Sequence, residues 1–216
     1  MSMNLYEILA LSAALTAVLM LGSMHIRTNL IFFAINTFFL SAETMLIGGI
    51  SGEGHLFYVG VAICFLKAVF IPIFLGWVRV RIGVKSETAA WISPSTAMFL
   101  GVALLGLSYL LSTSFPAVLG EGDTRIGSTA ALSILLSGML LMLTRRSAMS
   151  QIIGFLVIEN GIYLFTLTQT NGMPMVVEMG IMLDLLLAVM ICGLILFRIQ
   201  KNFEHIDVTL LTELKD

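Results

Sequence analysis

Charged side chains are scarce in this sequence, and their scarcity sets its class. Only 11% of the 216 residues are Asp, Glu, Lys or Arg, whereas 58% are hydrophobic and the mean hydropathy is +1.03. A typical soluble domain carries about 25% charged residues. The sequence therefore predicts a membrane protein, and because each crossing needs about 20 apolar residues, no length remains for a soluble catalytic domain.

Cysteine and histidine are also sparse. Cys64 and Cys192 lie in apolar runs without a CxxC motif or a Cys/His cluster, so we expect neither a disulfide nor an iron–sulfur ligand. His25, His55 and His205 fall in expected loops or the tail, which excludes a pair of haem ligands at mid-membrane depth. The basic residues form no continuous stripe that would bind nucleic acid. We expect this chain to hold no metal, no cofactor and no nucleic acid.

Apolar runs separated by polar or Gly/Pro-containing segments predict an all-α membrane helix bundle. About seven runs are long enough to cross a bilayer. They cover residues 5–24, 29–49, 56–78, 95–115, 126–143, 150–170 and 175–198. The predicted fold is therefore a polytopic bundle in which each short loop joins two antiparallel helices.

The basic residues predict the orientation of this bundle. Seven crossings place nine of them on the side that carries the C-terminal tail: Arg27, Arg79, Arg81, Lys85, Arg145, Arg146, Arg198, Lys201 and Lys215. The opposite side has only Arg125. Each residue taken singly can be explained as a solvated loop residue, but the asymmetry cannot. The positive-inside rule then predicts an outer N-terminus and a cytoplasmic C-terminus, in the cytoplasmic (inner) membrane of the cell.

Five ionisable residues fall inside the predicted spans. Lys67, Glu159 and Asp184 lie near the middle of their helices, whereas Glu178 lies near the outer end of its helix and Glu43 in the outer half of its own. A charge at the bilayer centre costs roughly 2.5 to 3.5 kcal/mol on insertion scales. Each of these residues therefore needs a partner, a wet cavity or a neutral state.

Two interpretations of these residues stay open. Buried carboxyl groups and a buried lysine suit a proton relay, because such groups exchange protons near neutral pH. Alternatively, Lys67 forms a structural ion pair with Glu159 or Asp184, which by itself would indicate little about function. Glu43 and Glu178 have a further alternative, because residues nearer the surface can extend to interfacial water.

A proline follows the lysine on the same predicted helix. In the run FLKAVFIPIFLGW, Pro72 removes the backbone donor that would bond to the carbonyl of Ala68. We expect the helix to kink or loosen beside Lys67. A freed carbonyl next to a buried ammonium is a place for water, although an ordinary proline kink is the simpler interpretation.

Four segments resemble the hydrogenase-4 component E family, a membrane subunit of formate hydrogenlyase-type and related complexes. They are FLKAVFIPI, RRSAMSQIIGFLVIENGIYLF, VEMGIMLDLLLAVMICGLILFRI and the tail HIDVTLLTELKD. The resemblance covers roughly residues 56–216. The ENG within the sixth predicted helix and the tail are its most specific parts.

The last three predicted helices are similar to the small K subunit of respiratory complex I. Arg145 and Arg146 match its arginine-rich loop, and Asp184 stands near the place of its second buried glutamate. Glu159 falls about one turn later than the first glutamate when Gly154 is aligned on the preceding glycine. This resemblance divides the chain into three parts. They are a four-helix part at residues 1–125, a three-helix part at 126–198 and a tail at 199–216.

The resemblance implies a non-redox subunit in the membrane arm of a complex-I-like hydrogenase. Nickel–iron and iron–sulfur centres would lie in partner subunits, and antiporter-like membrane subunits would be its neighbours. Lys67, Glu159 and Asp184, with Glu178 as an access residue, would then belong to a proton or sodium path. Glu43 precedes the resembling segments, so only its position inside an apolar run makes it a further candidate for that path. Two other hypotheses stay open: a transporter, either alone or as part of a multi-subunit cation/proton antiporter, and a structural spacer whose charges fix helix register.

Overall fold

A computed structural model describes residues 5–52, 54–82, 90–113, 123–170 and 180 of the chain. The chain divides into two units, Met1–Gly180 and Ile181–Asp216. The second unit lies wholly outside the described residues, so everything that follows concerns the first. Apart from one isolated bridge between Ala90 and Arg145, the described residues form helices and the turns between them.

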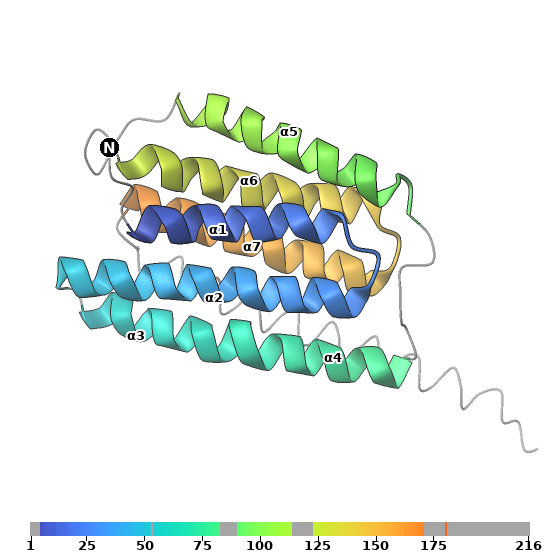
Figure 1. Cartoon of the computed structure of the whole chain (residues 1–216). Coiled ribbons are helices and arrows are strands. Elements are labelled where there is room, and N and C mark those ends of the chain that lie inside the picture. The colour runs from blue at the N-terminus through green and yellow to red at the C-terminus, as the bar shows by residue number, and fades with distance from the viewer. Residues whose placement is uncertain (1–4, 53, 83–89, 114–122, 171–179, 181–216) are drawn as a thin grey trace, which may run out of the picture. The chain divides into compact units, whose positions relative to one another are not determined.

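The described helices run side by side (Figure 1). The helices are α1 (Leu5–Leu21), α2 (Ile26–Ser51), α3 (Gly54–Ile63), η1 (Cys64–Phe70), α4 (Ile71–Ile82), α5 (Pro94–Ser112), α6 (Asp123–Thr144) and α7 (Ala148–Thr170). The third predicted span is therefore divided into three consecutive segments, α3, η1 and α4, of which η1 is a π-helix.

The helices have the length and composition of membrane spans. Five of them, counting α3 to α4 as one, are long and apolar enough to cross a bilayer, and α1 is apolar but only 17 residues long. Large apolar side chains such as Phe99, Leu143 and Phe65 are 69–75% exposed on the outside of the bundle. The prediction of an all-helical fold with several candidate membrane spans is therefore confirmed for the described residues. The seventh predicted helix, 175–198, lies outside the described residues, so the count of seven and the orientation stay predictions.

Two helices, α6 and α2, each pack closely against several neighbours and so organise the bundle. The α6 helix contacts α7, α1 and α5, whereas α2 contacts α1, α3 and α7. Glycines allow these backbones to approach: a Cβ built on Gly161 of α7 would lie 2.6 Å from the backbone nitrogen of Leu135 in α6. A Cβ on Gly60 of α3 would lie 3.0 Å from the carbonyl oxygen of Ser41 in α2. Small residues at such contacts are typical of helix association in membranes.

Several helix ends differ from the predicted boundaries. The expected loop at residues 50–55 is much shorter, because α2 continues to Ser51 and Gly52 ends it with a left-handed φ of 72°, a conformation that glycine adopts without steric cost. The α4 helix continues to Ile82, which places Arg79 and Arg81 in its last turn. Basic side chains there interact favourably with the helix dipole. Hydropathy missed the end of α4 because arginine interrupts the apolar run, and it missed the end of α2 because glycine and serine lower the hydropathy there.

Candidate functional site

The π-helix η1 holds Lys67 inside the bundle. The N–H of Ile71 donates to the carbonyl of Leu66, five residues back, which is the wider π pattern. The predicted loosening beside the lysine therefore takes the form of a π-helix. In this pattern the carbonyl that faces Pro72 is that of Lys67, whereas the α-helical pattern would have placed Ala68 there. Such π turns within α-helices occur frequently at functional sites.

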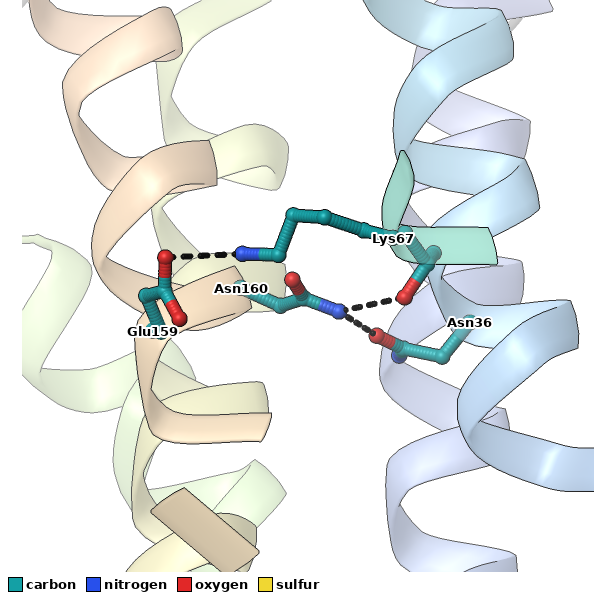
Figure 2. A network of polar contacts seen from close by, with 5 residues as sticks. Asn36, Lys67, Glu159 and Asn160 are labelled. Carbon is teal, nitrogen blue, oxygen red and sulfur yellow. Dashed lines mark hydrogen bonds and ion pairs between the residues drawn. The ribbon is translucent and has the colours of Figure 1, made fainter. Parts of the chain in front are cut away.

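Lys67 pairs with Glu159 of α7. The ammonium Nζ lies 2.8 Å from Glu159 Oε1, and the two residues are 8% and 5% exposed (Figure 2). This distance is that of a charge-assisted hydrogen bond. Removing two charges from water costs several kcal/mol per ion, and the attraction offsets this only in good geometry. Of the two partners that the sequence allowed, the structure brings Glu159 to the lysine.

The two acidic residues predicted on the last helix, Glu178 and Asp184, lie outside the described residues. Gly180, which lies between them in sequence, is described. A Cβ built on Gly180 would lie 3.2 Å from Glu159 Oε1. The chain at residue 180 therefore passes directly beside the carboxylate of the pair.

A network of buried amides and hydroxyls lies next to the pair. Asn160 Nδ2 donates to Asn36 Oδ1 at 3.0 Å and to Thr37 Oγ1 at 2.8 Å (Figure 2). Asn36 Nδ2 in turn donates to the carbonyl of Ala13 at 2.7 Å and to Thr16 Oγ1 at 3.2 Å. Asn36, Thr37 and Asn160 are fully buried. These bonds tie α1, α2 and α7 together beside Glu159. The charge and hydropathy patterns of the sequence predicted no role for these side chains.

Glu43 lies further along α2, apart from the Lys67–Glu159 pair in the hydrogen bonds of the described residues. Its side chain is 1% exposed, and its Oε2 has no hydrogen-bond partner in the described part of the chain. The next residue, Thr44, shares a 3.1 Å hydrogen bond with the hydroxyl of Tyr163 on α7. A side chain buried to this extent does not extend to interfacial water, so the snorkelling interpretation does not fit Glu43.

Arg145 is a buried structural residue at the end of α6. Its guanidinium donates to the carbonyls of Leu21 at 2.7 Å and Ser23 at 3.2 Å, and to the sulfur of Met24. Arg145 is only 2% exposed, so it is not a solvated loop residue. Leu21 is the last residue of α1, where a helix leaves acceptors without intrahelical donors, and Ser23 follows it in the turn. Arg145 thereby fixes the turn between α1 and α2.

Replacing Arg145 with methionine is expected to destabilise the bundle by about 2 to 4 kcal/mol, because buried carbonyls lose a charged donor. The matched control is Arg146→Met. Arg146 is exposed, and its guanidinium stacks 3.8 Å above the ring of Trp91, a contact worth about 0.5 to 1 kcal/mol. Thermal unfolding of the purified variants in detergent measures the difference. Equal melting temperatures for the two variants would contradict the role of Arg145.

The chemistry available at the site is that of proton and charge transfer. Within the described ranges, no group of three or more His, Cys, Asp or Glu residues is arranged to hold a metal ion. The site instead offers one ammonium, one carboxyl group and a set of neutral amides and hydroxyls. Such groups can hold, accept or pass on a proton.

The fold and the site define a multi-pass helical membrane protein with a buried lysine–glutamate pair. The chain is 34% identical over 182 residues to the uncharacterized protein Rv0085 of Mycobacterium tuberculosis, across 82% of this chain and 80% of that protein. It therefore belongs to the same family as that protein. It is also 25% identical over 149 residues to hydrogenase-4 component E of Escherichia coli K12 and of Shigella flexneri, across 69% of this chain and 68% of each relative. The resemblance seen in the sequence is thus confirmed as a distant relationship. No family model and no solved structure matches the chain.

Proposed function

We propose that this chain is a non-redox membrane subunit of a complex-I-like, membrane-bound hydrogenase. In this proposal Lys67 and Glu159 take part in proton or sodium translocation that is coupled to a peripheral oxidoreductase arm. The observation that carries the proposal is the 2.8 Å contact between these two residues, buried inside the apolar bundle. The distant relationship to hydrogenase-4 component E supports the choice of complex.

A buried ion pair of this kind can respond to charge in its surroundings. The pair exists either as ammonium and carboxylate or with Glu159 protonated, and the low dielectric of the interior makes each state sensitive to neighbouring charges. An ion that arrives nearby would therefore change the protonation of Glu159. The π-helix that contains Lys67 supports this proposal, because π turns within α-helices occur frequently at functional sites.

The remaining acidic residues extend the proposed path. In the predicted helix 175–198, Asp184 follows Gly180 by four residues and Glu178 precedes it by two. On their positions in this predicted helix, we propose Asp184 as the next carboxyl group of the path and Glu178 as the access residue. Glu43, buried on α2, is proposed as a further acidic group of the path.

The proposed complex is tested by its partners. We expect the chain, purified from its native membrane in a mild detergent, to bring with it antiporter-like membrane subunits together with nickel–iron and iron–sulfur proteins. These partners would hold the redox centres. Isolation of the chain alone, or with antiporter subunits only, would reject the hydrogenase proposal and favour a cation/proton antiporter.

A structural spacer is the second candidate, and one observation favours it. The amide network joins α1, α2 and α7 through neutral hydrogen bonds, so the helices hold their register without any ion transfer. In a spacer, the Lys67–Glu159 pair would only add to this register. Stability and transport therefore have to be measured separately in variants of Lys67 and Glu159.

A further inference from the structure

The amide of Asn160 has a fixed orientation, which the hydrogen-bond chemistry of its neighbours determines. The carbonyl of Ala13 can only accept, so the NH2 group of Asn36 must face α1. The carbonyl oxygen of the Asn36 side chain then faces α7 and requires a donor, which is the NH2 group of Asn160. The Asn160 side-chain oxygen must therefore point away from Asn36. This orientation follows from the chain of donors and acceptors, with no choice of amide flip left open.

The oxygen that this arrangement leaves over is an unused acceptor. Asn160 is fully buried, and its Oδ1 has no hydrogen-bond donor among the described residues. A buried acceptor without a donor costs free energy, so such an atom calls for an explanation. In Figure 2 the side-chain oxygen of Asn160 points to the side on which the Lys67 side chain extends to Glu159. Glu159 and Asn160 are consecutive on α7, so one lysine can serve either.

We propose that Asn160 Oδ1 is a second acceptor for the ammonium of Lys67, used when Glu159 is neutral. This inference rests on the proposed function, because ion transfer is what would bring a proton to Glu159. When a proton binds the Glu159 carboxylate, a new O–H bond forms and the attraction for the ammonium falls. Lys67 keeps its own protons and turns from Glu159 Oε1 to Asn160 Oδ1. No electron moves, and the only covalent change is the proton gained by the carboxylate.

The other nearby acceptors are less suited to this role. Thr37 Oγ1 and Asn36 Oδ1 each already accept a hydrogen bond from Asn160 Nδ2. Among the described residues of this network, Asn160 has an oxygen without a hydrogen-bond donor on an amide that is held in place from the other end. Asn36 is thus a positioning residue, because its bonds to α1 keep the Asn160 oxygen turned toward Lys67.

A double-mutant cycle on the full chain tests the proposal without any transport measurement. Asn160→Leu removes the second acceptor, and Glu159→Leu removes the first and mimics its loss of charge. Each change alone removes one of the two acceptors proposed here for Lys67, and both together remove the two of them. We expect the fall in melting temperature of the double variant to exceed the sum of the two single falls by about 3 °C or more. The amide bonds lost with Asn160→Leu are lost in both backgrounds, so they cancel in the cycle.

The control replaces Asn160→Leu with Thr44→Val. Thr44→Val also removes one hydrogen bond between α2 and α7, but away from Lys67, so its effect should add to that of Glu159→Leu. If the Glu159→Leu chain does not fold, the cycle is run with Glu159→Gln. Glutamine keeps a neutral oxygen that Lys67 can use, so we expect an excess of the same sign but smaller. If the effects of Asn160→Leu and Glu159→Leu are additive, Asn160 is not a second acceptor for Lys67. This result would leave the proposed function standing, because transport through Glu159 is measured independently.

Discussion

The Lys67→Met variant is expected to lose much of its stability. Methionine fills a similar volume but leaves the Glu159 carboxylate buried without its ammonium. Removing one partner of a buried ion pair typically costs about 3 to 5 kcal/mol. For a chain of this size that corresponds to a fall of roughly 6 to 20 °C in melting temperature. Thermal unfolding of the variant in detergent, beside the wild-type protein, provides the measurement.

The double variant Lys67→Met/Glu159→Gln separates a structural role of the pair from a functional one. It removes both charges, so no buried carboxylate remains unpaired, and we expect it to recover most of the stability that Lys67→Met loses. We expect this double variant not to translocate ions, because neither side chain can then hold a charge. A double variant that regains stability and also translocates ions at the wild-type rate would establish the structural spacer.

Much of the fold follows from hydropathy. Each described helix lies within a few residues of an apolar run, because a span needs about 20 apolar residues whatever its neighbours are. An observed helix end differs from the predicted one where charged residues belong to the last turn, as Arg79 and Arg81 do in α4. Hydropathy counts such a residue as an interruption, whereas the helix dipole favours it there.

The site was only partly predictable. The presence of Lys67 and Glu159 inside apolar runs marked them as costly to bury, and Pro72 marked the helix segment that loosens into a π-helix. Which carboxyl group pairs with Lys67 depends on how α7 packs against α2 and η1, and sequence periodicity does not determine that contact. Glu178 and Asp184 lie outside the described residues and remain predictions.

Two features escaped the sequence analysis although signals for them exist. Asn36 and Asn160 are amides in the middle of apolar helices, where a polar group needs a hydrogen-bond partner as much as a charge does. Neither residue is charged, so the charge pattern did not mark them. Arg145 matched an arginine-rich loop by sequence, but its burial against the carbonyls of Leu21 and Ser23 depends on tertiary contacts with α1.

The Glu159→Gln variant is expected to reduce coupled ion translocation by at least about tenfold, because glutamine keeps the size of the side chain but can neither release nor accept a proton at this position. Lys67 retains a neutral oxygen acceptor, so the bundle should still fold and assemble with its partners. Thr44→Val is the matched control: it removes a hydrogen bond between α2 and α7 without touching the ion pair. We expect it to translocate ions at close to the wild-type rate.

The central claim is that the buried pair conducts ions, and the most direct test is ion uptake per redox turnover. The purified complex would be reconstituted into vesicles, with the amounts of all subunits equalised between wild type and Glu159→Gln. We predict that Glu159→Gln assembles normally and turns over its redox substrate, but moves less than about a tenth of the wild-type number of ions per turnover. Wild-type ion uptake per turnover in a fully assembled Glu159→Gln complex would contradict the account.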